Sequence, residues 1–171
     1  GSEHLGLPVY DTVGEAVRQF LLTLWNTYSF WVLYANAEDL GPHDFTAASP
    51  SRGSFSTDDV DKEPRDANDL DRWALSRLQA TIGTVRERMD AFDCTAAGKA
   101  IAEYVEELSN WYVRLSRRRF WEGDRAAFAT LRHCLLETAA LLAPFTPFLA
   151  DEIHLNLTGG SAGEAGPPDS V

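Results

Sequence analysis

Apolar residues recur at helical spacing along most of the chain, beginning with a segment from about Asp11 to Ala35. The second half of this segment is apolar on nearly every side, which is typical of a helix that is buried on most sides or meets another protein surface. One small bundle cannot enclose all of its aromatic side chains, so we expect some of them to face a neighbouring domain. They are Trp25, Tyr28, Phe30, Trp31 and Tyr34.

A second helix is predicted from about Leu70 to Phe92, capped by Asn68 or Asp69. Its inner face repeats at spacings of three and four residues and comprises Leu70, Ala74, Leu78, Ile82, Val85, Met89 and Phe92. Gly83 lies in the middle of this pattern and costs a helix about 1 kcal/mol relative to Ala. We therefore expect a close helix contact at Gly83.

A third helix is predicted from a cap at Asp93 or Thr95 to about Phe120. Its inner face comprises Ile101, Tyr104, Val105, Leu108, Tyr112 and Leu115. The Gly123-Asp124 pair ends this helix and starts the next, which runs from about Arg125 to Ala143 with Phe128, Leu131, Leu135 and Leu142 inward. Pro144 breaks that helix because it removes a backbone donor.

Thr146-Pro147 has the pattern of an N-cap followed by a first-turn proline, and it starts a short helix that ends near Leu157.

Residues 41–68 hold prolines, glycines and many acids without apolar periodicity, so we expect an acidic loop or a partly disordered insertion there. Residues 1–10 are interpreted as a tag remnant and lead-in, and residues 158–171 as a flexible tail or linker. The predicted domain, residues 11–157, is an all-α bundle of four long helices plus one short C-terminal helix.

Composition narrows the class of protein. The chain of 171 residues is long enough for one domain with a substantial core. Cys94 and Cys134 lie far apart in helical patterns, which favours buried thiols in a reducing compartment over a disulfide framework. No signal peptide or apolar run of membrane-spanning length is found, so we expect a cytoplasmic protein with no membrane partner.

Charge is distributed unevenly along the chain. The formal net charge is −11, which by itself argues against a nucleic-acid partner. Residues 38–71 contain ten acids and three bases, however, whereas residues 110–121 contain four arginines and no acid. The local reversal of sign makes the second segment the place where a polyanion would bind.

No catalytic constellation can be assembled from the sequence. His4, His43, His133 and His154 are scattered without metal-ligand spacing, and there is no glycine-rich phosphate loop. His133 adjoins Cys134, but neighbouring residues on a helix point in different directions. We therefore expect no catalytic residue, no metal site and no cofactor in this chain.

Helical periodicity predicts the direction of each arginine in residues 110–121 relative to the core, whose side of the helix is marked by Leu108 and Leu115. Trp111, Arg114 and Arg118 fall along one edge, with Trp111 and Arg118 flanking the core, while Arg117 points almost fully outward. Arg119 falls near the core line, where it can bridge to another helix. A stacking side chain beside guanidinium groups suits RNA.

Two other interpretations remain open from the residues alone. The arginines can pair with Glu103, Glu106, Glu107 or the acidic loop of residues 41–68, or they can complement the dipole at the end of the helix. In that case the chain is a protein–protein interaction module without RNA binding, which docks a partner on the apolar side of residues 11–35. A further interpretation, a catalytic helical bundle, fails because the sequence contains no set of residues that could bind a catalytic metal.

The chain carries six sequence blocks in this order: Leu24-Trp25-Asn26-Thr27-Tyr28-Ser29-Phe30 with Leu33-Tyr34-Ala35-Asn36, Leu70-Asp71-Arg72-Trp73, Asn110-Trp111-Tyr112-Val113-Arg114, Arg117-Arg118-Arg119-Phe120-Trp121, Thr130-Leu131, and Ala143-Pro144-Phe145-Thr146-Pro147-Phe148. Together these blocks resemble the anticodon-stem-binding helical bundle of class I isoleucyl-tRNA synthetases. The resemblance covers residues 11–157. It implies an isoleucine tRNA as the partner, with Trp111, Arg114, Arg117 and Arg118 as contacts and Arg72 and Arg77 as secondary ones.

The resemblance also implies what this chain does not do. It lacks the HIGH and KMSKS signatures of class I enzymes and any editing domain, so it is similar to an excised domain that is not catalytic by itself. Activation of isoleucine with ATP and Mg²⁺ would occur in the parent ligase, whose catalytic domain would pack on the helix of residues 11–35. We expect the isolated chain to be a monomer.

Overall fold

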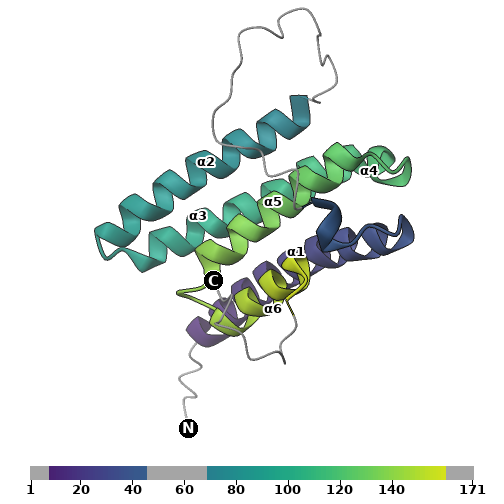
Figure 1. The fold of residues 1–171 in the computed structure, drawn as a ribbon. Helices are drawn as coiled ribbons and strands as arrows, with labels where there is room; N and C mark the ends of the chain where they lie inside the picture. The colour runs from purple at the N-terminus through teal and green to yellow at the C-terminus, as the bar shows by residue number, and fades with distance from the viewer. Residues whose placement is uncertain (1–7, 46–68, 161–171) are drawn as a thin grey trace, which may run out of the picture.

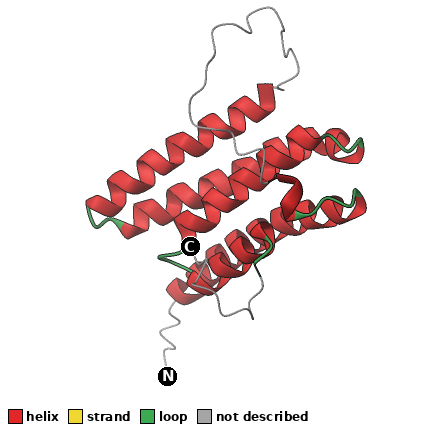
Figure 2. Ribbon diagram, in the orientation of Figure 1, coloured by secondary structure: helices red, strands yellow, loops and turns green. Residues whose placement is uncertain are grey.

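The fold is known from a computed structural model, which describes residues 8–45 and 69–160. All regular elements within these residues are helical (Figure 2), so the predicted fold class is confirmed. The elements are α1 (Pro8–Ala37), the 3₁₀ helix η1 (Pro42–Phe45), α2 (Asp69–Asp90), α3 (Cys94–Glu107), the π-helical segment η2 (Leu108–Val113), α4 (Arg114–Trp121), α5 (Arg125–Leu142) and α6 (Pro147–Thr158).

The helices form one bundle (Figure 1). α2 packs along α3 and on α5, α5 packs along α6, and α1 packs against α3, η2 and α5. α3, η2 and α4 succeed one another without a break in helical backbone geometry and form the long third helix that the sequence predicts. Side-chain hydrogen bonds add to this packing: the Trp31 indole donates to the Phe128 carbonyl at 2.9 Å and so joins α1 to α5.

The aromatic half of α1 is only partly enclosed, as expected. Tyr28 and Trp31 are buried, and Trp25 is exposed. Leu22 and Leu33 are exposed as well, and their spacing places them on the same side of the helix as Trp25. The helix thus has an apolar outer side in addition to the side that faces the bundle.

The π-helical segment η2 changes which residues of the third helix face the core beyond it. Leu115, predicted to be inside, is 55% exposed, whereas Ser116 and Phe120 are fully buried. A π turn uses more residues than an α turn, and each additional residue rotates the rest of the helix by about 100°. The inner face of the third helix therefore passes from Leu108 and Tyr112 to Ser116 and Phe120, and the prediction for Leu115 is wrong because it assumed a uniform α-helix.

Phe120 is the centre of the core at this end of the bundle. Its ring packs edge-on against Phe30 of α1 at 5.1 Å and against Phe128 of α5 at 5.0 Å between ring centroids. Tyr112 lies at 6.5 Å in the same edge-on arrangement. Edge-to-face contacts of this kind stabilise aromatic pairs beyond their buried area. One side chain thereby joins α1, η2 and α5 to α4.

The helix ends agree well with the predicted caps. The Asp93 carboxylate accepts from Ala96 N at the start of α3, and Asp124 accepts from Ala126 N at the start of α5. Gly123 adopts φ 72°, a conformation that glycine tolerates, between α4 and α5. Pro147 is the first residue of α6, although the Thr146 side chain makes no capping bond. At the N-terminus, α1 begins at Pro8, earlier than the predicted start at Asp11.

Three further expectations for single residues are wrong. Phe92 lies beyond the end of α2 with φ 59° and is exposed, because the turn into α3 takes it away from the inner face. Outside Gly83, its two neighbours and the backbone of its own helix, no heavy atom of the described residues lies within 4 Å of a Cβ built on Gly83, so no close helix contact explains it. Cys134 is buried, but Cys94 is exposed because it lies in the first turn of α3.

The stretch expected to be a loop after Gly41 begins with ordered structure. Pro42–Phe45 forms η1, and Phe45 is buried with its ring 5.9 Å from that of Trp31. The Arg132 guanidinium of α5 lies over the Phe45 ring, at 5.5 Å from its centroid. A single aromatic residue thus anchors this polar segment to the core. The remaining predictions for residues 46–68, for residues 1–7 and for residues 161–171 lie outside the described residues.

Because η2 changes the inner face of the helix, we expect substitutions of two apolar residues of α4 to affect stability very differently. Phe120→Ala should lower the free energy of unfolding by about 3–5 kcal/mol, the usual cost of removing a buried aromatic ring. Leu115→Gln should change it by less than about 0.5 kcal/mol, as is usual for surface substitutions. Urea denaturation of the two variants measures both values. A large cost for Leu115→Gln would show that the helix continues in register through η2.

The open surroundings of Gly83 predict that Gly83→Ala is stabilising. The added methyl group meets no described atom, and alanine is favoured over glycine in a helix interior by about 0.8–1 kcal/mol. Denaturation midpoints of the variant and the original chain give the difference. A loss of stability would mean that Gly83 makes a close approach which the bundle does not show.

Candidate nucleic-acid interface

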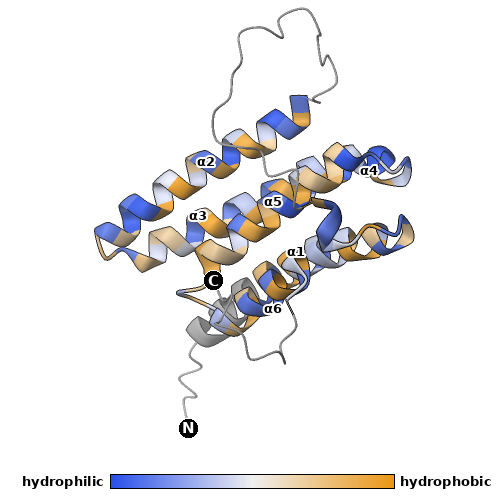
Figure 3. Cartoon of the chain, in the orientation of Figure 1, coloured by the Kyte–Doolittle hydropathy of each residue, from blue (hydrophilic) through white to orange (hydrophobic). Residues whose placement is uncertain are grey.

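Three arginines of α4 form an exposed basic surface, which we call the arginine strip: Arg114, Arg117 and Arg118. Arg114 and Arg117 form no ion pair with any carboxylate in residues 8–45 and 69–160. Figure 3 shows hydrophilic residues gathered in part of α4. Two of the three guanidinium groups are therefore available to an anionic ligand.

Arg118 is engaged but remains accessible. Its Nε donates to Glu122 at 2.7 Å across one helical turn, and the two side chains are 87% and 53% exposed. The hydrogen bond to Glu122 raises the pKa of Arg118, which stays charged. Surface pairs of this kind are weak because water competes with both partners. A phosphate could displace Glu122 from Arg118 without unfolding anything.

Trp111 is exposed in η2, the segment that leads into the arginine strip. Its indole is 59% exposed, whereas the next residue, Tyr112, is fully buried. The rotation of the helix beyond η2 turns Arg118 further from the core than a uniform helix would. The sequence placed both residues as flanking the core, and the structure places them on the outer face.

Arg119 has a structural position, as one of the sequence-based alternatives proposed. Its guanidinium donates to both carboxylate oxygens of Asp71 at 2.8 and 2.7 Å, and its Nε donates to Asp124 at 2.7 Å. We call these three residues the acid–arginine clamp. The clamp joins the first turn of α2, the end of α4 and the start of α5. It therefore determines where the arginine strip lies relative to α2.

The clamp is hydrogen-bonded further into the core. The Tyr112 hydroxyl donates to Asp71, and burial together with this hydrogen bond raises the pKa of Tyr112. The hydrogen bonds that Arg119 donates to Asp71 raise the pKa of Arg119. Burial by itself would raise the pKa of Asp124, but the Arg119 hydrogen bond and the backbone donor at Ala126 outweigh it, so the pKa is lowered. Arg119 and Asp124 are thus held in their ionised forms.

The two secondary candidates on α2 differ in their surroundings. Arg72 is exposed in the first turn, and it forms no ion pair with the part of the chain that the structure describes. Arg77 donates two hydrogen bonds to Glu107 of α3 at 2.7 and 2.8 Å, which raise its pKa. Arg72 can extend the basic surface, whereas the charge of Arg77 is already compensated.

The sign of the charge reverses along the exposed side of the long third helix. On the α3 side of Trp111, a shallow cleft of about 260 Å³ is lined by Glu103, Glu106, Glu107, Asn110 and Trp111 itself. On the α4 side lies the arginine strip. A polyanion is repelled by the first half and attracted by the second. Contact with phosphates is therefore confined to the part of the helix after Trp111.

An apolar cleft of about 310 Å³ opens beside Trp111 and is lined by Leu70, Trp73 and Trp111; we call it the tryptophan cleft. Trp73 was not among the candidate residues predicted from the sequence. Its spacing from Leu70 marks a shared helix side, but no local signal indicates that the first turn of α2 meets η2. That proximity depends on tertiary packing.

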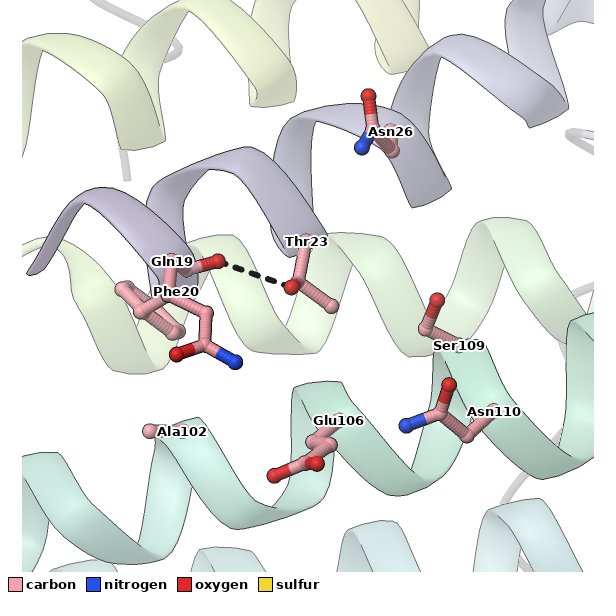
Figure 4. Close-up of a pocket in the computed structure, with 8 residues that line it drawn as sticks. All are labelled: Gln19, Phe20, Thr23, Asn26, Ala102, Glu106, Ser109 and Asn110. Carbon is pink, nitrogen blue, oxygen red and sulfur yellow. Dashed lines mark hydrogen bonds between the residues drawn. The ribbon is translucent and has the colours of Figure 1, made fainter. Parts of the chain in front are cut away.

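The largest of these surface hollows is a polar groove between α1 and the third helix (Figure 4), with a volume of about 390 Å³. Amide and hydroxyl side chains dominate it, and Glu106 is the single ionisable residue in its lining of Gln19, Phe20, Thr23, Asn26, Ala102, Glu106, Ser109 and Asn110. Thr23 donates to its own helix at Gln19. A nucleophile paired with a base is absent from these eight residues.

The remaining chemistry of the described residues is structural. Burial raises the pKa of Cys134 to about 12, so this thiol is protonated and cannot act as a nucleophile. Within residues 8–45 and 69–160, no group of three or more His, Cys, Asp or Glu side chains could hold a metal ion. The helices of this part of the chain are also too short or too polar to cross a membrane.

A helical bundle with one basic helix beside an exposed tryptophan is typical of a helical nucleic-acid-binding domain. Comparison with known families supports this class. The family model described as the anticodon-binding domain of tRNA ligase matches residues 71–171. The chain belongs to this family. The matched residues include η2, α4, the arginine strip and the whole acid–arginine clamp.

Curated relatives of this chain are isoleucine–tRNA ligases. Those of Bacillus thuringiensis (strain Al Hakam) and Deinococcus radiodurans are 45% and 46% identical over 155 and 153 residues. That of Streptomyces coelicolor is 42% identical over 148 residues. These alignments cover 88%, 86% and 86% of the chain but only 13%, 12% and 13% of the relatives. The chain thus spans a small part of the length of the proteins it matches.

The acid–arginine clamp predicts a large cost for removing its cation. Arg119→Met leaves the Asp71 carboxylate buried without a counter-charge, which should lower the free energy of unfolding by about 3–5 kcal/mol. Asp71→Asn combined with Arg119→Met removes both charges and should recover part of that loss. A double-mutant cycle by chemical denaturation measures the coupling. If the single variant is as stable as the original chain, the pair does not hold α2 to α4.

Proposed function

We propose that this chain is the part of an isoleucine–tRNA ligase that binds the anticodon stem of its tRNA through the arginine strip. The observation that carries the proposal is the exposed guanidinium groups of α4 together with the exposed indole in η2 just before them. The chain is otherwise strongly acidic, with a net charge of −11. Such a local basic surface is the expected footprint of an RNA-binding domain.

The contacts proposed for the stem are independent of sequence. Arg114 and Arg117 can each donate two hydrogen bonds to a phosphate, and Arg118 can do so after leaving Glu122. A-form stems are recognised mainly by shape and by phosphate and 2′-OH contacts, which suits a row of guanidinium groups on one helix. Arg72 adds a fourth cation on α2. Arg77 is a weaker candidate because Glu107 holds it.

The alternative function, a protein–protein interaction module, is less well supported. The family match favours RNA binding, and the exposed apolar side of α1 has a role within the proposal. Leu22, Trp25 and Leu33 would pack against the catalytic domain of the ligase. Activation of isoleucine with ATP and Mg²⁺ would take place in that domain, and this chain by itself would bind tRNA without charging it. We place the ligase in the cytoplasm, because a tRNA-binding surface can act only where tRNA is present.

The proposal predicts salt-dependent binding of isoleucine tRNA that requires the arginine strip. Filter binding by the 171-residue chain at two salt concentrations should give log K against log salt with a slope of about −2 to −3, as expected for three phosphate contacts. Arg114→Glu combined with Arg118→Glu should weaken binding by about 10-fold or more and make the slope shallower by about 2.

The matched control changes the net charge by the same amount elsewhere. Arg86 and Arg88 are exposed near the far end of α2, so Arg86→Glu with Arg88→Glu should leave the affinity within about twofold of the original at moderate salt. An affinity that survives reversal of Arg114 and Arg118, or that falls equally in the control, would contradict the assignment of the strip.

A further inference from the structure

One exposed side chain of α4 has no part in the core or in the stem contacts described so far. Trp121, the last residue of the helix, is 77% exposed, whereas the neighbouring Phe120 is fully buried. A single exposed apolar residue needs no explanation by itself. Tryptophan is, however, a favoured residue at binding surfaces, because it combines a large apolar face with one N–H donor. Its position relative to the arginine strip therefore matters.

Trp121 lies between the arginines of the strip when α4 is viewed along its axis. The helix is a regular α-helix over Arg114–Trp121, so each residue turns by about 100° from the one before it. Trp121 comes to within about 20° of Arg114 and about 40° of Arg117, while Arg118 lies about 40° to the other side of Arg114. The indole thus projects from the same side as the strip, with guanidinium groups on both flanks of its direction.

The charge of the surface changes sign at Trp121. Glu122 follows it directly and accepts a hydrogen bond from Arg118. The Glu38 carboxylate lies beside Gly123, with one oxygen 2.8 Å from the position of a Cβ built on that glycine. These carboxylates repel a phosphate but accept hydrogen bonds from hydroxyl groups. The part of a ligand that meets Trp121 is therefore uncharged, whereas the part that meets the arginine strip is anionic.

We infer that Trp121 enters the minor groove of the bound stem and packs against a ribose there, while the arginine strip binds the phosphates beside it. This inference rests on the proposed function and adds the choice of groove and a contact that is selective for RNA. The major groove of an A-form stem is too deep and narrow for side chains to read, but the minor groove is wide and shallow and displays the 2′-hydroxyls. One large side chain that projects from a helix fits the second groove.

A ribose at this place satisfies each group at the end of α4. Its carbon atoms pack against the indole ring, and its 2′-hydroxyl accepts a hydrogen bond from Trp121 Nε1–H. The hydroxyl also donates, and Glu122 accepts from it once a phosphate has replaced this carboxylate on Arg118. A deoxyribose has no 2′-hydroxyl. Trp121 therefore contributes a preference for RNA that the arginines alone do not supply.

Other occupants suit this surface less well. An apolar side chain of a protein would cover the indole but leave the arginine strip without an anionic partner. A cationic side chain would suit the indole and Glu122, but the strip would repel it. The backbone of a nucleic acid alternates neutral sugars with phosphates, so one strand supplies both kinds of contact.

The test compares two hairpins of the same stem sequence, one with ribose and one with 2′-fluoro sugars, which keep the A-form but cannot donate from the 2′ position. Filter binding by the 171-residue chain is measured for each hairpin at several salt concentrations. Trp121→Leu keeps an apolar contact but has no N–H donor, so it should weaken binding of the ribose hairpin by about 3- to 10-fold and of the 2′-fluoro hairpin by less than about twofold. The slope of log K against log salt should stay the same, because the phosphate contacts remain.

Two variants serve as matched controls. Leu115→Gln replaces an exposed apolar residue of the same helix that lies about 120° around the axis from Trp121. Trp25→Leu removes an exposed tryptophan of α1. Each should leave the affinity for both hairpins within about twofold of the original. The melting temperature of Trp121→Leu should match that of the original chain, and a large decrease would show that the indole is packed and unable to enter a groove.

Arg114→Glu combined with Arg118→Glu separates this inference from the proposed function. The charge reversal should weaken the binding of both hairpins, and if it weakens neither, the proposed function itself fails. If it weakens both while Trp121→Leu leaves both unchanged or weakens them equally, the ribose contact is overturned and the phosphate contacts of the strip stand.

Discussion

The π-helical segment η2 is the constraint on which the interface depends. A continuous α-helix from Cys94 to Trp121 would direct Leu115 inward and place Phe120 toward the rim. The additional residue in the turn at η2 rotates the helix after it, so that Ser116 and Phe120 enter the core. The same rotation turns Arg118, which a uniform helix would place beside the core, to the outer face. Packing of the aromatic cluster around Phe120 and exposure of Arg118 are therefore two consequences of one backbone feature.

The acid–arginine clamp then decides what lies next to the strip. A buried ion pair gains little net stability over an apolar pair of the same shape, because desolvation opposes the attraction. Its geometry, however, is specific: both oxygens of Asp71 accept from Arg119, and Asp124 caps α5 while it contacts the same guanidinium. The clamp thus sets the position of α2 and α5 relative to α4. Arg119 is unavailable to RNA for this reason, although it belongs to the same run of arginines.

The acidic and basic side chains on the exposed side of the third helix restrict the orientation of a bound polyanion as well as attract it. Glu103, Glu106 and Glu107 precede Trp111, and the arginine strip comes after it. A phosphate chain can approach such a surface in few orientations, since half of it is repulsive. Arg77 is held by Glu107 within the acidic half and strengthens the contact between α2 and α3. An acidic protein can in this way bind RNA at one small place without attracting it elsewhere.

Sequence periodicity by itself determined the helical class, the order of the helices and most of the core. Leu78, Ile101, Leu108, Leu131 and Leu135 are buried as predicted, because amphipathic spacing depends only on local geometry. The caps at Asp93 and Asp124 were predictable for the same reason: each carboxylate bonds to a backbone donor two or three residues away. The basic segment was visible because charge composition needs no fold to be counted.

Tertiary structure decided everything that depends on residues distant in sequence. The outward rotation of Leu115 and Arg118 results from a helix irregularity that no residue in η2 announces, since π turns arise from packing demands as well as local preference. Periodicity placed Arg119 near the core, but only the structure shows its partner, Asp71, which lies 48 residues away in sequence. The tryptophan cleft likewise exists only because the bundle brings α2 against η2. Sequence periodicity indicates which side of each helix is buried and which is exposed to water. Only the packing of the bundle determines which helices contact each other.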